Sequence, residues 1–127
     1  MSAAPGPSSL KPLYWIGSAR DDLISFPGPA RREAGYALYL AQLGMKAAKA
    51  KPLKGFGSAG VLEIMSEHDG NAYRAVYTVK FSKAVFVVHA FQKKSKKSIA
   101  TPKAEMDVIK RRLKTAADEY RRLYESD

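Results

Sequence analysis

The sequence predicts an α+β fold, in which a small antiparallel β-sheet carries N-terminal helices and a C-terminal amphipathic helix. Asp69-Gly70 separates two segments of strand character, which is the pattern of a β-hairpin. Residues 84–91 are almost entirely apolar and predict a central strand. The C-terminal helix is predicted by apolar residues at three- and four-residue steps, namely Met106, Ile109, Leu113, Ala116, Tyr120 and Leu123.

The N-terminal half predicts one short strand and two helices. Residues 13–17 form an aromatic and aliphatic run that ends in Gly, as a short strand does. Ser18 is the expected cap of a short helix to about Ser25, because its hydroxyl can bind free amide groups. Apolar residues recur at helical spacing over 30–43, and Gly44 is expected to end that helix. A lysine-rich segment broken by Pro and Gly follows over 46–60 and predicts a basic loop.

Local signals also predict the start of the C-terminal helix and the two faces of the second hairpin strand. Thr101 is expected as the N-cap of the C-terminal helix, with Pro102 at the first helical position. The second strand of the hairpin alternates between two faces, and Arg74 falls on the face expected to be polar. The other face is expected to be core and consists of Tyr73, Ala75, Tyr77, Val79 and Phe81.

Length and charge restrict the class of protein. The chain has 127 residues with 22 Lys and Arg against 12 Asp and Glu, which gives a formal net charge of +10. We expect a disordered tail over residues 1–10 and a single domain over 11–127. So positive a domain attracts polyanions, of which nucleic acids and the ribosome are the commonest in the cytosol.

Several classes of function are disfavoured. The chain has no cysteine and only two histidines, so we expect no disulfide, no thiol nucleophile, no metal site and no cofactor. No apolar run is long enough to span a membrane, and the first ten residues lack the pattern of a signal peptide. A cytoplasmic protein without a membrane partner is expected.

Basic residues are the candidates for phosphate binding. Four lysines follow directly on the predicted central strand, where they can attract phosphates; the alternative is a solvated loop that aids solubility. Arg74 lies on a strand and can present its guanidinium to a phosphate from a fixed position. An ion pair with Glu63 on the neighbouring strand is the competing explanation for Arg74. The four lysines are Lys93, Lys94, Lys96 and Lys97.

The two histidines are the candidates for acid–base catalysis, because histidine titrates near neutral pH. His68 lies in the predicted hairpin turn, and its alternative role is that of an exposed turn residue. His89 lies in the apolar strand, where two-residue periodicity groups it with Val85, Val87 and Phe91. A buried, hydrogen-bonded histidine is the alternative there. For both residues we favour the alternative over catalysis.

The order and spacing of several motifs resemble the RelE/HigB toxin superfamily, and its phage-derived HigB-like branch in particular. The resemblance covers roughly residues 13–124. Its sharpest motifs are Pro52–Gly57, Leu62–Ile64, Tyr73–Tyr77 and His89–Lys97, followed by Thr101, Pro102 and Glu105.

The resemblance implies a small antiparallel sheet with helices packed on one side. It also implies the toxin of a type II toxin–antitoxin system, a ribosome-dependent mRNA endoribonuclease that inhibits translation. In such toxins the 2′-OH of a nucleotide in the ribosomal A site attacks its own 3′ phosphate. The implied partners are the ribosome, mRNA and a cognate antitoxin, expected to be of the helix-turn-helix type.

The resemblance also assigns roles to residues. Arg74 matches the family arginine that contacts the scissile phosphate, and Lys94 matches the basic residue that assists it. Lys54 would lie on the basic loop, while Lys93, Lys96 and Lys97 would bind mRNA or ribosomal RNA. The chain departs from RelE on the strand before the hairpin, where Glu63 and Met65 stand at the approximate positions of RelE lysines.

Two other functions compete with the toxin. The first is a nonenzymatic, prophage-derived basic domain that binds nucleic acid or a protein partner. The second, a metal-free phosphodiesterase acting on free RNA, is less favoured because the sequence offers no self-sufficient acid–base pair.

Overall fold

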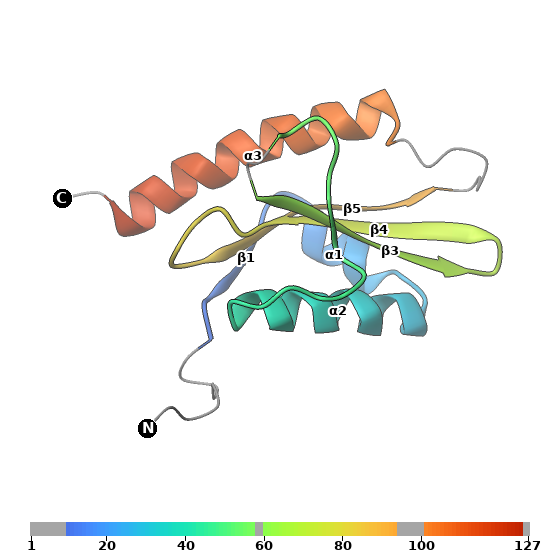
Figure 1. Cartoon of the computed structure of the whole chain (residues 1–127). Helices are drawn as coiled ribbons and strands as arrows, with labels where there is room; N and C mark the ends of the chain where they lie inside the picture. Colours follow the sequence, from blue (N-terminus) through green and yellow to red (C-terminus); the bar gives the residue numbers. More distant parts are fainter. Residues whose placement is uncertain (1–9, 58–59, 94–100, 126–127) are drawn as a thin grey trace, which may run out of the picture.

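A five-stranded sheet lies between two helical layers in the computed structural model, which describes residues 10–57, 60–93 and 101–125 (Figure 1). The strands, in the spatial order β1-β5-β4-β3-β2, are β1 (Leu13–Trp15), β5 (Val85–Lys93), β4 (Asn71–Thr78), β3 (Val61–His68) and β2 (Lys51–Pro52). The helices are α1 (Ala19–Ile24), α2 (Gly28–Gln42) and α3 (Lys103–Tyr124). None of these helices has the length and apolar character needed to cross a membrane.

The predicted α+β class is confirmed, with two differences in arrangement. β1 runs parallel to β5, with Leu13 opposite Val85, whereas the other strand pairs are antiparallel. Helices also cover both faces of the sheet, whereas the family resemblance implied one face. The apolar run of β5 explains the second difference, because a strand whose successive residues are all apolar has two faces to bury.

Each face of the sheet has its own apolar core. The first core joins α1 and α2 to the sheet through residues such as Leu38, Ile64 and Tyr77. The second core joins α3 to the opposite face through residues such as Ile109 and Phe86.

The face of β4 that was expected to be polar is buried in this second core. Arg74, Val76 and Thr78 are at most 2% exposed. Phe81 also packs on the α3 side, although the alternation placed it in the first core, because β4 ends at Thr78 and the alternation stops there. The expectation of a polar face was wrong because α3 covers it, and no pattern local to β4 reports that contact.

The hairpin between β3 and β4 forms at the predicted Asp-Gly pair. His68 pairs with Asn71, and the two residues between them have positive φ angles of 49° at Asp69 and 81° at Gly70. Asp and Gly tolerate this left-handed conformation better than other residues do.

Neither predicted side-chain cap forms. Ser18 occupies the N-cap of α1, but its hydroxyl donates to Asp22 Oδ2 at 2.7 Å and makes no capping hydrogen bond. The N-cap of α3 is Pro102, one residue later than predicted. Thr101 is thereby placed beside β4, where its Oγ1 accepts a 3.4 Å hydrogen bond from Arg74.

Arg112 of α3 covers the edge of β5 where its pairing with β1 ends. Its Nη1 donates to the carbonyl of Val88 at 3.1 Å, and its Nη2 donates to Ser18 Oγ at 3.1 Å. Gly17 permits this approach because it has no side chain: an added Cβ would lie 2.8 Å from the Arg112 guanidinium carbon. Its φ of 58° also favours glycine. These contacts tie α1, β5 and α3 together.

The segment after α2 crosses the β3 side of the sheet, from the α2 layer to the α3 layer (Figure 1). Lys49 Nζ anchors it by an ion pair of 2.8 Å with Glu33 of α2, and Glu33 also accepts a hydrogen bond from Ser66 of β3. β2 then pairs with β3, with Lys51 opposite Glu63. We call residues 44–57 the crossing segment.

Gly17→Ala is expected to destabilise the protein more than Gly44→Ala does. Both glycines have positive φ, so both variants acquire backbone strain of about 1–2 kcal/mol. Only Gly17 has the Arg112 guanidinium against it, whereas nothing lies within 4 Å of an added Cβ at Gly44. Urea unfolding should show an additional loss of about 1 kcal/mol for Gly17→Ala. Equal losses would mean that the Arg112 contacts contribute nothing.

Glu33→Gln is expected to destabilise the protein in a pH-dependent way. Hydrogen bonds from Lys49 and Ser66 lower the pKa of Glu33 below its usual value of 4.5. Their contribution is therefore present above pH 4.5 and is lost as the pH falls through the lowered pKa. We expect a loss of about 1 kcal/mol at pH 7, because Lys49 is largely exposed, and a shrinking difference in acid.

Urea unfolding at several pH values measures this difference in the free energy of unfolding. Glu125→Gln, a change of the same kind at an exposed residue after α3, serves as the control. A difference between wild type and Glu33→Gln that stays constant from pH 7 to pH 3 would contradict the assigned role of the carboxylate.

Candidate active site

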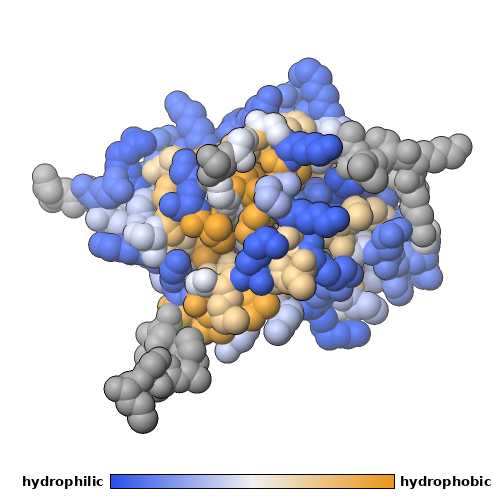
Figure 2. All heavy atoms as spheres, in the orientation of Figure 1, coloured by the Kyte–Doolittle hydropathy of each residue, from blue (hydrophilic) through white to orange (hydrophobic). Residues whose placement is uncertain are grey.

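A groove of about 550 Å³ opens on the α3 face of the sheet, between the crossing segment and the first turns of α3. In Figure 2, the face that carries the crossing segment has an apolar centre bordered by hydrophilic side chains. The groove therefore combines apolar walls with charged groups. Its lining residues are Lys51, Pro52, Leu53, Lys54, Gly55, Glu63, Met65, Arg74, Thr101 and Met106.

Arg74 and Glu63 bring opposite charges to this groove. Arg74 lies opposite Met65, and Glu63 lies opposite Val76, so both charged side chains are on the α3 face. Arg74 Nη1 is 3.0 Å from Glu63 Oε2, and the side chains are 3% and 16% exposed. The ion pair named as the competing explanation for Arg74 is thus present, and it holds the guanidinium in one orientation against the groove.

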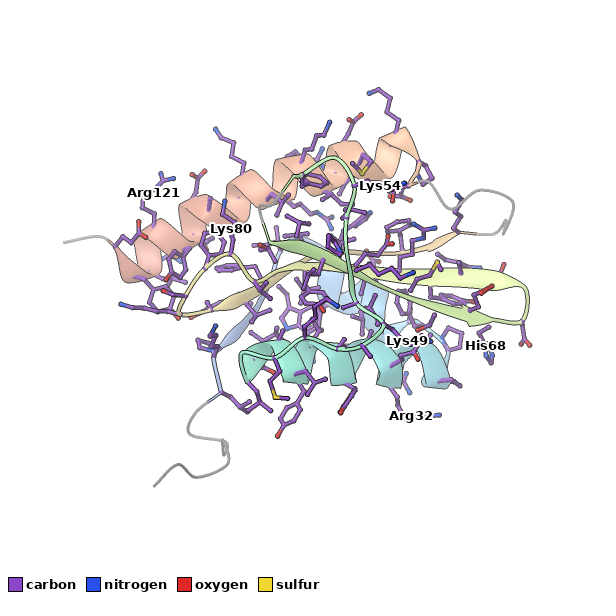
Figure 3. All side chains as sticks on the ribbon, in the orientation of Figure 1. Arg32, Lys49, Lys54, His68, Lys80 and Arg121 are labelled. Atoms are coloured by element: carbon purple, nitrogen blue, oxygen red, sulfur yellow. The ribbon has the colours of Figure 1, made fainter. Side chains whose placement is uncertain are left out.

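Two lysines of the crossing segment add positive charge. Lys51 and Lys54 are exposed residues that line the groove. Figure 3 shows Lys54 on the crossing segment beside α3. The structure therefore brings Lys54 and Arg74, which lie 20 positions apart in the sequence, to one groove. Lys51 was not singled out from the sequence as a site residue.

Of the four lysines predicted to bind phosphate at the end of β5, the structure describes only Lys93. Lys93 lies opposite Ala72, two residues beyond Phe91, which lies opposite Arg74. Lys93 is therefore on the same sheet face as Arg74, at the end of β5. Lys94, Lys96 and Lys97 lie outside the described residues, and their predicted roles remain predictions.

His68 does not lie with Arg74. It is the last residue of β3, two positions after Ser66, whose side chain contacts Glu33 of α2. The alternation of the strand therefore directs His68 to the α2 face, away from the groove. Its Nε2 is 3.3 Å from Asp69 Oδ2 in the hairpin turn, and Figure 3 shows it at that end of the sheet.

His89 is buried on the α3 face because of a β-bulge. Tyr77 pairs with Val87 and Val76 pairs with His89, so Val88 is an extra residue in β5. The bulge separates His89 from Val85 and Val87, which belong to the first core, and the predicted grouping with them was wrong. The predicted neighbour Phe91 does stack on the imidazole, with ring centroids 5.0 Å apart.

Both ring nitrogens of His89 have partners on α3. Arg112 Nη1 is 3.2 Å from Nδ1, and Glu105 Oε1 is 2.7 Å from Nε2. A guanidinium only donates hydrogen bonds, so Nδ1 accepts and the proton of the neutral ring lies on Nε2, which donates to Glu105. The imidazole is therefore fixed in orientation and tautomer.

His89 and Arg74 line different cavities. His89 lines a cavity of about 320 Å³ at the open edge of β5, together with Glu105 and Tyr73. Glu105 lines this cavity and the next residue, Met106, lines the groove, so the first turn of α3 lies between them. The structure does not bring His89 to Arg74 in one site.

Glu105 and Arg112 had no predicted role, and the role predicted for Glu63 was an ion pair. One signal was available for the first two, because residues seven positions apart lie on one side of a helix. The signal for Glu63 was the alternation of β3, which places it on the Arg74 face. No group of three potential metal ligands occurs within residues 10–57, 60–93 and 101–125. The groove offers one carboxylate and three cationic groups, namely a guanidinium and two ammonium groups. The cationic groups suit binding of an anionic phosphodiester.

Comparisons with known proteins agree with this architecture. Residues 21–114 match the model of a family described as phage-derived, Gp49-like proteins. The structure of E. coli toxin RelE, solved for a double arginine mutant in the free state, has a TM-score of 0.52 and 18% identity. That match covers 84% of this chain and 97% of the RelE chain.

A second solved structure is the toxin–antitoxin complex RelBE2 from Mycobacterium tuberculosis. It has a TM-score of 0.43 and 17% identity, over 72% of this chain and 100% of that chain. No curated protein matches this chain.

The family match runs from α1 into α3 and covers most of the chain, while RelE shares the overall fold. The resemblance to the phage-derived branch of the RelE/HigB superfamily is therefore confirmed. The chain belongs to the phage-derived Gp49-like family and has the fold of the RelE toxin.

Proposed function

We propose that this chain is the toxin of a toxin–antitoxin system and that it inhibits translation by cleaving mRNA on the ribosome. The observation that carries the proposal is the buried Arg74–Glu63 pair beside a groove that also holds Lys51 and Lys54. A phosphodiester is the substrate that such a positively charged groove fits. The fold shared with RelE supports the assignment to a toxin.

The groove residues divide the work of cleavage. Lys51 and Lys54 attract the RNA backbone, and Arg74 stabilises the charge that develops on the phosphate in the transition state. Glu63 accepts the proton of the 2′-OH as the 2′-oxygen bonds to phosphorus. The bond from phosphorus to the 5′-oxygen breaks, and that oxygen takes a proton from solvent. The products are a 2′,3′-cyclic phosphate and a 5′-OH.

The ribosome provides the alignment of the RNA in this proposal. Neither histidine lines the groove: His68 is on the other face of the sheet, and His89, although on the α3 face, lines a different cavity. Among the described residues that line the groove, Glu63 is the one carboxylate that can act as the base. Holding the 2′-oxygen in line with the leaving oxygen is worth several orders of magnitude in rate. A ribosome that holds mRNA in the A site supplies that alignment, so free RNA should be cut slowly.

The proposal includes the predicted partners and location. A cognate antitoxin, of the helix-turn-helix type, neutralises the toxin, and ribosomes and mRNA are encountered in the cytoplasm. Lys94 retains its proposed part in assisting Arg74, and Lys93, Lys96 and Lys97 their proposed part in binding RNA.

A second candidate function is a nonenzymatic domain that binds nucleic acid or protein. The observation that favours it is the burial of Arg74, whose charge Glu63 already balances. In that case Arg74 would be structural, and expression of the folded protein would not cut mRNA. Cells that express the soluble protein at a high level, yet grow normally and keep their mRNA intact, would therefore support this function.

Arg74→Ala is expected to slow cleavage by on the order of a hundredfold, the usual effect of removing one transition-state donor. The measurement is single-turnover cleavage of programmed ribosomes saturated with protein. Lys114→Ala is the matched control, since it removes one positive charge from an exposed position of α3. Cleavage by Arg74→Ala at the parental rate would refute the catalytic assignment.

Glu63→Gln keeps the size of the side chain and removes the proposed base. It should lower the same single-turnover rate by on the order of a hundredfold. Because Arg74→Ala leaves Glu63 without this partner, circular dichroism and thermal unfolding are needed to verify that each variant folds. A folded Glu63→Gln protein that retains full activity would exclude Glu63 as the base.

Lys54→Ala is expected to weaken ribosome binding with little effect on the rate at saturation. Lys54 is exposed, so it contributes attraction rather than a fixed contact in the transition state. Loss of about one phosphate contact should reduce the dependence of log affinity on log salt by about one unit. An unchanged affinity with a lower rate at saturation would reverse the roles of Lys54 and Arg74.

A further inference from the structure

The outer face of α2 carries large side chains that the fold does not bury. The inner face packs on the sheet through Ala34, Ala37 and Leu38. On the outer face, Tyr36 is 62% exposed and Tyr39 is 44% exposed. Tyrosine is enriched at the centres of protein interfaces, because it adds contact area and a hydrogen-bonding group at small entropic cost.

Gly35 lies on the same outer face, in the middle of the helix. Glycine is the poorest helix former after proline, so it destabilises this position relative to alanine. Nothing in the fold requires it, because its φ is not positive and no atom lies within 4 Å of an added Cβ. A residue without a side chain does, however, permit another backbone to approach closely. The exposed glycine is therefore an independent sign of a docked partner.

The charge of this face identifies the chemistry of the partner. Arg31 and Arg32 are exposed at the start of α2, and Lys46 is exposed after its end. The one acidic residue of the helix, Glu33, is engaged by Lys49 and Ser66. A partner with acidic side chains fits this surface, whereas a second copy of a chain of net charge +10 would bring like charges together.

We propose that the outer face of α2 binds an amphipathic helix of an acidic partner protein, which crosses α2 closely at Gly35. Tyr36 and Tyr39 contact the apolar stripe of that helix, and Arg32 meets its carboxylates. The identification of this partner as the antitoxin rests on the proposed function. Because α2 and the groove lie on opposite faces of the sheet, the partner leaves the groove open and acts by its bulk, which keeps the toxin out of the ribosomal A site.

The test uses the purified full chain and the product of the reading frame adjacent to its gene, with binding measured by calorimetry. Gly35→Ala should raise the melting temperature by about 3 °C, because alanine is the better helix former, yet weaken binding tenfold or more. Gly35→Leu should abolish binding and remain folded. The double variant Tyr36→Ala/Tyr39→Ala should weaken binding at least a hundredfold.

Substitutions in the groove serve as controls. Lys54→Ala should bind the partner within about twofold of wild type, since it lies on the other face of the sheet. Wild-type binding by Gly35→Leu, or strong loss of binding by Lys54→Ala, would overturn the proposal and favour a partner that covers the groove. Dimerisation of the chain that Gly35→Leu abolishes would assign the surface to a second copy instead.

The cleavage assay tests the proposed function independently of the docking proposal. Ribosomal cleavage by the isolated chain does not depend on the outer face of α2, so the α2 variants should cut at the parental rate. If the adjacent product does not bind at all, the docking proposal is refuted for that partner whatever the cleavage assay shows.

Discussion

The ion pair between Arg74 and Glu63 is the contact on which the candidate site depends. A guanidinium that is almost wholly buried is costly to the fold unless a carboxylate balances it, since an uncompensated buried charge costs several kcal/mol. Glu63 meets this requirement from the neighbouring strand, and Thr101 contacts the same nitrogen from the start of α3. The pair therefore joins β3, β4 and the entry to α3. The same geometry that makes the pair tolerable also gives the groove a guanidinium of fixed orientation.

In the proposed reaction, the same pair links catalysis to the stability of the fold. A phosphate that enters the groove must compete with Glu63 for Arg74, or must bind beside the pair. Transfer of the 2′-OH proton to Glu63 removes the carboxylate charge as negative charge grows on the phosphate. In the proposed reaction Arg74 therefore exchanges one anionic partner for another without becoming unpaired.

Local patterns in the sequence predicted most of the fold. Patterns of residues close together in the chain predicted the Asp69-Gly70 turn, the apolar strand β5 and the amphipathic α3. All three are present. The burial of Arg74 was not predictable in this way, because it depends on α3 covering a face that alternation alone suggests is polar. The position of His89 was not predictable either, because one extra residue at Val88 moves its side chain to the α3 face.

The residues of the candidate site were likewise predicted only in part from the sequence. The strand alternation and the family resemblance both selected Arg74, and the resemblance selected Lys54. Only the three-dimensional structure shows that neither histidine lines the groove with Arg74. His68 is on the other face of the sheet, while His89 is held by Glu105 and Arg112 on the far side of the first turn of α3. Contacts between α3 and the sheet involve residues distant in sequence, and these contacts determine which charged residues share a cavity.

The roles of Arg74 and Glu63 are tested most directly by an electron cryo-microscopy structure of this chain on a programmed ribosome. The mRNA in that complex carries 2′-O-methyl groups and therefore cannot be cut. We expect the phosphate of the A-site codon to lie in the groove, within hydrogen-bonding distance of Arg74, with the blocked 2′-oxygen beside Glu63. A phosphate bound in the cavity at the edge of β5, beside His89 and Glu105, would contradict these roles.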